Sequence, residues 1–281
     1  MKELLKKWLK KANIYHPLQR FYRSSLSTIK KHHYRISWRQ FRGKGYTCNY
    51  CGAEYQKFVP EYPTPDIAGA LKAHSVVAGY GDNVVCPNCL SKNRERLLKA
   101  VIGEYLTIGG KTVLHFSPER ALHRWLAREV TVKTVDLAPG FYRDIDPQIG
   151  FADATNLSFP DNSFDVVIAN HILEHIPDDR SAMREIYRVL RGEGVAILQV
   201  PYSETLTTTI EEPAIADPGR QAALFGQNDH VRIYSLRDYL QRLEAAGFQV
   251  RLLEPQTLSP FRIYAIQENE AVILCTKPIV G

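Results

Sequence analysis

The stretch TVLHFSPERAL, residues 112–122, passes from an apolar strand into a helix through a turn that contains no glycine. Thr112–Phe116 has the composition of a buried strand, and Glu119–Glu129 continues with helical spacing of its apolar residues. Strands and helices then alternate to the end of the chain. This alternation predicts an α/β domain with a doubly wound, mostly parallel, seven-stranded Rossmann-like sheet.

The further predicted elements place this domain at residues 93–281. A long polar insertion at residues 202–235 follows one predicted strand, and we expect it to form a substrate lid. The predicted strands are 130–135, 150–152, 164–169, 195–200, 249–253 and 271–276, and the predicted helices are 93–106, 178–190 and 235–248.

Four of the cysteines form two pairs, CNYC at residues 48–51 and CPNC at residues 86–89. Because the first residues lack the apolar run of a secretory signal, we expect thiolates rather than disulfides. Two such pairs can close the tetrahedral shell of one structural Zn²⁺, with Cys48, Cys51, Cys86 and Cys89 as its ligands. We therefore predict a small zinc-ribbon-like domain over residues 46–92, with an inserted loop near residues 59–66. Two unrelated surface pairs, or a redox pair, are the alternatives.

Positive charge is concentrated at the beginning of the chain. Residues 1–45 hold 13 Lys and Arg against Glu3 alone, a net +12, whereas the whole chain carries +6. Leu4, Leu5, Trp8 and Leu9 share one side of a predicted helix. This basic helical leader fits an anionic membrane surface, a nucleic-acid backbone, or a solvated arm without a partner. No apolar run is long enough to span a bilayer, and we expect a cytoplasmic protein, with attachment at the inner membrane surface under the membrane hypothesis.

The ends of three predicted strands carry the side chains that a cofactor needs. Phe116, Ser117 and Pro118 end the first strand, Asp136 and Leu137 the second, and Asn170 and His171 the fourth. Open α/β sheets bind ligands beyond the carboxyl ends of their strands. Asp136 follows Ser117 by 19 residues, close to the interval at which an acid meets ribose hydroxyls, and its carboxylate repels phosphate.

Three linked motifs resemble the class I methyltransferases that use S-adenosylmethionine: TVDL at 134–137, the stretch at 153–178, and AMREIYRVLRGEGVAILQVP at 182–201. The LHFSPE turn, the CPNC pair and FGQNDHVRIYS at 225–235 are similar to a type 11-like subgroup with N-terminal cysteine knuckles. The resemblance implies that Asp136 binds the ribose, that Asp153 and Ala154 bind the adenine, and that Asn170 and His171 line the methionine end. This cofactor has no phosphate, so glycine is not obligatory in the first turn.

Methyl transfer to a hydroxyl needs alignment and the removal of a proton, which suits a positioned histidine. We name His171 and His230 as candidate bases, with Asp229 beside His230, and give His175 a structural role. In a helix, His171 and His175 would share a face that excludes Glu174. We expect His115 in the core and no metal at the histidines. Arg232 would bind an acidic substrate or pair with Glu211 or Glu212.

The resulting hypothesis is an S-adenosylmethionine-dependent methyltransferase that modifies an oxygen of a small molecule or glycan. One alternative is an RNA methyltransferase that grips phosphate with its knuckles and basic leader. Nucleic acid is the less favoured partner, because NHIL at 170–173 lacks the Asn/Asp-Pro-Pro-aromatic run associated with base methylation. The other alternative is a non-catalytic adaptor with a degenerate methyltransferase fold.

Overall fold

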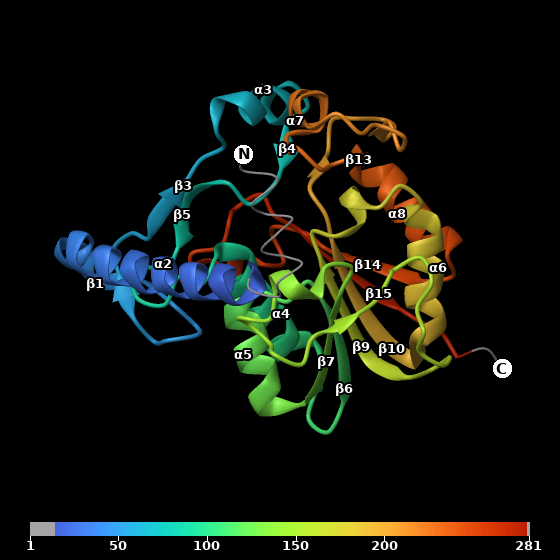
Figure 1. The fold of residues 1–281 in the computed structure, drawn as a ribbon, viewed down its shortest axis with the longest axis horizontal. Coiled ribbons are helices and arrows are strands. Elements are labelled where there is room, and N and C mark those ends of the chain that lie inside the picture. The colour runs from blue at the N-terminus through green and yellow to red at the C-terminus, as the bar shows by residue number, and fades with distance from the viewer. Residues whose placement is uncertain (1–14, 280–281) are drawn as a thin grey trace.

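The computed structural model describes the backbone of residues 15–279 and the side chains of residues 25–279 (Figure 1). Its central sheet has seven strands in the order β14-β15-β10-β9-β6-β7-β8. Strands β10, β9, β6, β7 and β8 run parallel, and β15 runs antiparallel to both of its neighbours. The predicted doubly wound sheet is confirmed. Its strands are β6 (Thr112–Phe116), β7 (Thr131–Asp136), β8 (Gly150–Phe151), β9 (Phe164–Asn170), β10 (Leu190–Gln199), β14 (Gln249–Leu253) and β15 (Val272–Thr276).

Helices cover both faces of the sheet (Figure 1). Along β6, Leu114 and Phe116 enter the core on one face, and Val113 enters the core on the other, as the two-residue period of a strand requires. The first core also contains α6 and α8, and the second contains α4 and α5. None of the described helices is both long and apolar enough to cross a membrane. The four helices are α4 (Asn93–Tyr105), α5 (Arg120–Glu129), α6 (Asp179–Val189) and α8 (Leu236–Ala245).

The part before α4, which we call the four-cysteine module, contains two antiparallel strand pairs, β1 with β2 and β3 with β5. Its first strand begins at Arg42, inside the predicted leader. The helix predicted around Leu4 and Leu9 lies outside the described residues. The elements of the module are α2 (Tyr15–Ser37), η1 (Arg39–Phe41), β1 (Arg42–Thr47), β2 (Glu54–Tyr55), β3 (Val59–Glu61) and β5 (Gly81–Val85).

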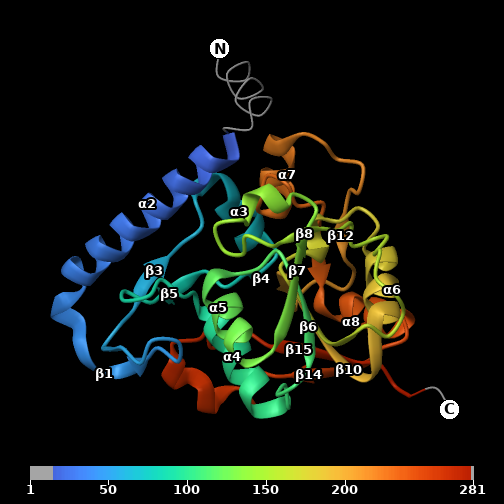
Figure 2. The same cartoon turned by 60° about the horizontal axis from the view of Figure 1, so that its bottom comes forward.

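The loop predicted near residues 59–66 instead contains β3 and the start of a helix. The segment between β3 and β5 contains α3 (Pro65–Ala73) and β4 (Val76–Val77). Strand β4 pairs with β11 of the lid, in a four-stranded sheet of order β12-β13-β11-β4. Helix α3 lies beside α7 in both views (Figures 1 and 2). The insertion and the lid therefore form one structural unit. The lid elements are β11 (Tyr202–Ser203), β12 (Ile210–Glu211), α7 (Pro218–Phe225) and β13 (Arg232–Ser235).

Gly226 fixes the contact between these two helices. It ends α7 in the left-handed conformation, with φ +78°, and a Cβ atom there would lie 2.6 Å from Cδ2 of Leu71 on α3. Any larger residue would have to displace the Leu71 side chain and would strain the left-handed backbone. Gly226 is therefore a helix cap in a close packing contact, within the predicted lid.

Arg96 joins the four-cysteine module to the sheet domain. Its side chain is fully buried and donates five hydrogen bonds to backbone carbonyls. Within the described chain, no carboxylate forms an ion pair with it. The acceptors lie in β5, in the second cysteine knuckle and at the end of η4 (Ser259–Tyr264), so one guanidinium holds three segments that are distant in sequence. They are the carbonyls of Asn83, Val84, Ser91, Tyr264 and Ala265.

Replacing Arg96 with Met should lower the free energy of unfolding by about 3 kcal/mol or more, because buried carbonyls lose their donors. Urea denaturation followed by circular dichroism measures the change. Arg124→Met, at an exposed position on α5, is the matched control and should shift stability by less than about 0.5 kcal/mol. Equal stability of the two variants would contradict the joining role.

Candidate functional site

A cleft of about 660 Å³ lies at the carboxyl ends of β6, β7 and β9, where the strand order reverses. This volume lies within the range of small-molecule sites. Pro118, which the sequence placed in the cofactor site, is buried beside the cleft and does not line it. The predicted residues that do line it are Phe116, Ser117, Asp136, Leu137, Asp153, Ala154, Asn170 and His171.

The turn without glycine still uses a backbone conformation that favours glycine. Ser117 has φ +43°, in the left-handed region, and its N–H donates to the carbonyl of Val135 at 2.9 Å. The Ser117 hydroxyl donates to Asp136 Oδ2. His171, which follows β9, is also left-handed, with φ +57°. Such strain in ordinary residues is concentrated at functional sites, and both of these residues line the cleft.

The polar and apolar groups of the cleft suit a nucleoside. Asp136 presents its carboxylate at the end of β7, and Leu137 next to it is 65% exposed. Asp153 Oδ1 accepts hydrogen bonds from the N–H and hydroxyl of Thr155, at 2.9 and 2.7 Å. Asn170 is buried, and its Oδ1 has no hydrogen-bond partner among the described residues. An apolar surface beside carboxylates and a free acceptor can hold a base, a ribose and an ammonium group.

Glu119, which was not among the predicted site residues, lines the same cleft. Its carboxylate lies 3.0 Å from His115 Nε2 and accepts a hydrogen bond from the Asn170 amide. Burial would raise the pKa of Glu119, but the interactions with His115, Arg94 and the Asn170 amide together outweigh it and lower the pKa. The fully buried His115, expected in the core, thus supports an ionised acid in the cleft. The signal in the sequence was an acid at the start of the helix after the first strand.

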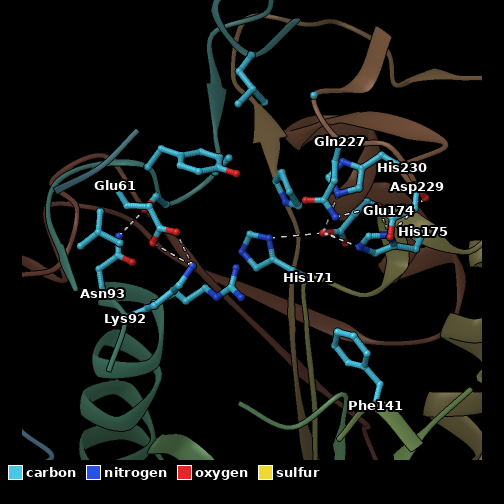
Figure 3. A pocket seen from close by; sticks show the side chains of 18 of the residues that line it. Glu61, Lys92, Asn93, Phe141, His171, Glu174, His175, Gln227, Asp229 and His230 are labelled. Atoms are coloured by element: carbon cyan, nitrogen blue, oxygen red, sulfur yellow. Dashed lines mark hydrogen bonds and ion pairs between the residues drawn. The ribbon is translucent and has the colours of Figure 1, made fainter. Parts of the chain in front are cut away.

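A second cavity of about 350 Å³ adjoins the cleft, and we call it the acceptor pocket. Its walls come from the insertion in the four-cysteine module, from the start of α4 and from the lid, and most of its lining is polar. His171 and Arg94 line both cavities. Figure 3 shows His171, His175 and His230 gathered around Glu174 at one end of this pocket.

The arrangement around Glu174 differs from the one predicted. Residues Leu173–His175 form a 3-10 turn rather than an α-helix, which brings Glu174 against the histidines. Its Oε1 lies 3.5 Å from His171 Nδ1, 4.0 Å from His175 Nε2 and 3.9 Å from His230 Nε2. Burial would raise the pKa of Glu174, but these histidines lower it to about 2.

The predicted partnership of Asp229 with His230 is also different. Asp229 Oδ1 lies 3.4 Å from Nδ1 of His175, whereas Nδ1 of His230 lies 3.3 Å from the carbonyl of Phe225. Burial lowers the pKa of His230 to about 4, so this ring is neutral near pH 7. His175, expected to be structural, therefore lies in the same cluster as the candidate bases.

Arg232 is a positioning residue and does not face substrate. Its side chain is 1% exposed and pairs with Glu211 at 2.9 Å, one of the two outcomes expected from the sequence. It also donates to the carbonyls of Leu173, Ile176 and Pro177. These bonds tie strand β13 of the lid to the turn that carries Glu174 and His175.

The four cysteines come together as predicted. Their Sγ atoms all lie within 4.8 Å of one another, with Cys48 and Cys89 at 3.5 Å and Cys51 and Cys86 at 3.8 Å. A tetrahedral site with Zn–S bonds of about 2.3 Å places its sulfurs about 3.8 Å apart. Both knuckles turn alike, since the residues that lie four positions after the first cysteine of each pair, Gly52 and Leu90, both have φ +66°. The donor set and its spacing therefore fit zinc.

Comparisons with known proteins identify methyltransferases as similar proteins. Residues 116–198 match the family model described as a methyltransferase domain. The chain is 29% identical over 133 residues to the uncharacterized methyltransferase YcgJ of Bacillus subtilis (strain 168), a match that covers 46% of this chain and only about half, 49%, of that protein. It is 28% identical over 229 residues to the 27-O-demethylrifamycin SV methyltransferase of Amycolatopsis mediterranei (strain S699), covering 75% and 76%.

A solved complex between the Haloferax volcanii Trm112 methyltransferase activator and a methyltransferase contains a chain of similar fold. The match has a TM-score of 0.50 at 14% identity and covers 66% of this chain and 90% of that chain. At this identity the likeness concerns the fold alone.

Replacing Arg232 with Lys should lower the free energy of unfolding by about 2 kcal/mol, because one ammonium cannot replace a guanidinium fork that bonds three carbonyls and a carboxylate. Arg220→Lys on α7 is the control: its side chain is 62% exposed and pairs with Glu212, so its loss should be below about 1 kcal/mol. Thermal and urea unfolding compare the two variants. A smaller loss for Arg232→Lys than for Arg220→Lys would refute the positioning role.

Proposed function

The chain contains a class I S-adenosylmethionine-dependent methyltransferase domain, and from this premise we propose that it transfers a methyl group to an oxygen of a small-molecule or glycan acceptor. The main support for the proposal is that the two cavities adjoin and that His171 lines both of them. One cavity has the acid and apolar groups for a nucleoside, and the other is small and polar. The Amycolatopsis relative is named a 27-O-demethylrifamycin SV methyltransferase, and this name supports oxygen as the acceptor atom.

When bound, the cofactor supplies a methyl group that its sulfonium already makes electrophilic. Asp136 would hold the ribose hydroxyls, and Leu137 would contact the adenine. Asp153 and Ala154 would contact its ring edge. The unpartnered Oδ1 of Asn170 would accept from the ammonium of the methionine portion. All five residues line the cleft, so the fit needs no rearrangement of strands.

The acceptor would enter the polar pocket with its hydroxyl toward His171. A histidine at the shared wall can take the hydroxyl proton while the oxygen attacks the methyl carbon in line, and a positioned base of this kind contributes about 10² to 10⁴ in rate. Asp229 and His230, the other candidates from the sequence, would act on the acceptor from the lid side. Arg94, which also lines both cavities, adds a cation at their junction.

A structural zinc ion belongs to the same proposal. Four thiolates and one Zn²⁺ together carry a charge of about −2, which would compensate the buried charge of Arg96. The knuckles also contact α4 directly: Asn49 Nδ2 donates to the carbonyl of Arg96 at 2.8 Å, and Tyr50 donates to that of Glu95 at 2.8 Å. The ion would hold the start of α4, and with it the wall of the acceptor pocket.

Asp136→Ala should weaken binding of S-adenosylhomocysteine about 5- to 150-fold, because the ribose hydroxyls lose a hydrogen-bond acceptor worth about 1 to 3 kcal/mol. Isothermal titration calorimetry measures the affinity, and Asp161→Ala, at a 67% exposed side chain, is the control. Unchanged affinity in Asp136→Ala would refute this placement of the cofactor. A wild-type chain that binds no S-adenosylhomocysteine would favour the adaptor hypothesis.

One observation favours RNA as the alternative acceptor. A groove of about 540 Å³ between α2 and α5 is lined by several cations, and Arg124 and Arg128 in it are exposed. Such a surface fits a phosphate backbone or an anionic membrane. The cations of the groove are Lys31, Arg35, Lys99, Arg120, Arg124 and Arg128.

If the chain acts on a small molecule or glycan, deleting residues 1–37 should leave S-adenosylhomocysteine binding unchanged, and no RNA binding should survive physiological salt. The deletion stops before β1, so it spares the strands and cysteines of the four-cysteine module. Fluorescence anisotropy with labelled RNA at several salt concentrations, and flotation with anionic vesicles, provide the measurements. Tight RNA binding that falls steeply with salt and is lost on deletion would support the RNA hypothesis instead.

A further inference from the structure

The carboxylate of Glu174 is buried without a hydrogen-bond donor. Its side chain is 1% exposed, and no group in the part of the chain that the structure describes donates to either of its oxygens. An ionised carboxylate removed from water in this way is costly unless a cation or several donors compensate it. The groups that surround it are imidazoles, which come from the same turn and from the lid (Figure 3).

The contacts of two of these imidazoles decide which ring nitrogens face the carboxylate. His175 Nδ1 lies 3.3 Å from the carbonyl of Asp229 and 3.4 Å from its carboxylate, and His230 Nδ1 lies 3.3 Å from the carbonyl of Phe225. All of these neighbours are acceptors, so each Nδ1 carries the hydrogen. A bound metal requires neutral rings, and in that state both Nε2 atoms direct lone pairs toward Glu174.

Three acceptor atoms therefore converge on one point: Oε1 of Glu174 and the Nε2 atoms of His175 and His230, all within 4.8 Å of one another. Two separations are 4.0 and 3.9 Å, too long for a hydrogen bond even from a protonated ring. The ligand atoms of a tetrahedral Zn²⁺ with bonds near 2.0–2.1 Å lie about 3.3 to 3.5 Å apart. Shifts of about half an ångström in side-chain position would close the set around an ion.

We propose that Glu174, His175 and His230 bind a first-row divalent cation, of the class of Zn²⁺, separate from the ion at the cysteines. Two imidazole nitrogens and one carboxylate form a ligand set of the kind found where a metal keeps an open position for substrate. The contacts of Nδ1 to Asp229 and Phe225 are the outer interactions that orient metal-bound histidines. The open side of the set faces the acceptor pocket, which these three residues line.

The role of this cation rests on the proposed function. Bound at the open position, the acceptor hydroxyl would lose its proton to His171, whose Nδ1 lies 3.5 Å from the same Glu174 oxygen. The acceptor oxygen would then form a bond to the methyl carbon, and the electron pair of the breaking C–S bond would return to sulfur as a neutral thioether. A metal-bound oxygen loses its proton at lower pH than a free one, which assists this step.

The test counts metal ions on the full chain. A chelator first removes bound metal from the protein under reducing conditions. The protein is then titrated with Co²⁺ and, separately, with Zn²⁺, and bound metal is measured by inductively coupled plasma mass spectrometry. We expect two ions per wild-type chain and one in Glu174→Gln. His32→Ala, which removes an exposed imidazole from α2, is the matched control and should keep two.

The cobalt spectrum distinguishes the two sites. The ion at the cysteines gives strong thiolate charge-transfer absorption, which should be equal in all variants and also shows that the four-cysteine module is folded. The second ion should add weaker ligand-field bands, and Glu174→Gln should bind it at least about 100-fold more weakly. If Glu174→Gln does not fold, His175→Gln, at a side chain 29% exposed, replaces it.

Saturation of the wild-type chain at one ion, with only the thiolate spectrum, would overturn the proposal, as would a second ion retained in both variants. Calorimetry with S-adenosylhomocysteine on the same samples keeps this result separate from the proposed function. Cofactor binding with one ion refutes the second metal site alone, whereas two ions without cofactor binding refute the methyltransferase proposal alone.

Discussion

The burial of Arg96 is the constraint on which the arrangement of both cavities depends. A guanidinium without a carboxylate partner among the described residues is satisfied only if five carbonyls from three segments meet around it. Those segments are β5, the second cysteine knuckle and the end of η4. Once they are fixed, α4 begins at Asn93 against the module, and Arg94 lies at the junction of the cleft and the acceptor pocket. The four-cysteine module thus contributes to the site by supporting one of its walls.

The opposite wall depends on a second buried arginine. Arg232 bonds the carbonyls on both sides of the turn that carries Glu174 and His175, and Val231 N–H donates to the carbonyl of Glu174. Strand β4 then joins the lid to the insertion between the cysteine pairs. The lid is therefore connected to the module on one side and to the sheet domain on the other, so the distance between the two walls of the pocket is set by the β4–β11 pairing and by the hydrogen bonds of the Arg232 side chain.

Local patterns were sufficient to predict the sheet and part of the cleft. Apolar runs alternating with helical spacing located every strand of the sheet, and the strand ends identified Asp136 and Asn170. Asp153 came from the resemblance to the methyltransferases, and all three residues line the cleft. The cluster at Glu174 was not predictable in the same way. It depends on a 3-10 turn that was not predicted, and on a lid residue, His230, that is 56 positions away from Glu174 in the numbering. Strand β4, Val76–Val77, was also missed; it pairs with β11 of the lid, a partner that is distant in the sequence.

The first turn shows why a missing motif residue is weak evidence of lost function. Glycine is common in this turn because it adopts positive φ without cost, yet Ser117 adopts φ +43° here and compensates with two hydrogen bonds, one from its N–H to Val135 and one from its hydroxyl to Asp136. The hydroxyl also fixes one oxygen of the carboxylate, leaving its orientation determined before any ligand binds. A glycine would relax the backbone but would remove this bond, so that Asp136 would be held only by the N–H of Ala138, which donates to its Oδ1. Ser117 therefore strains the backbone but fixes the orientation of the Asp136 carboxylate. A preorganised carboxylate would favour binding of ribose hydroxyls.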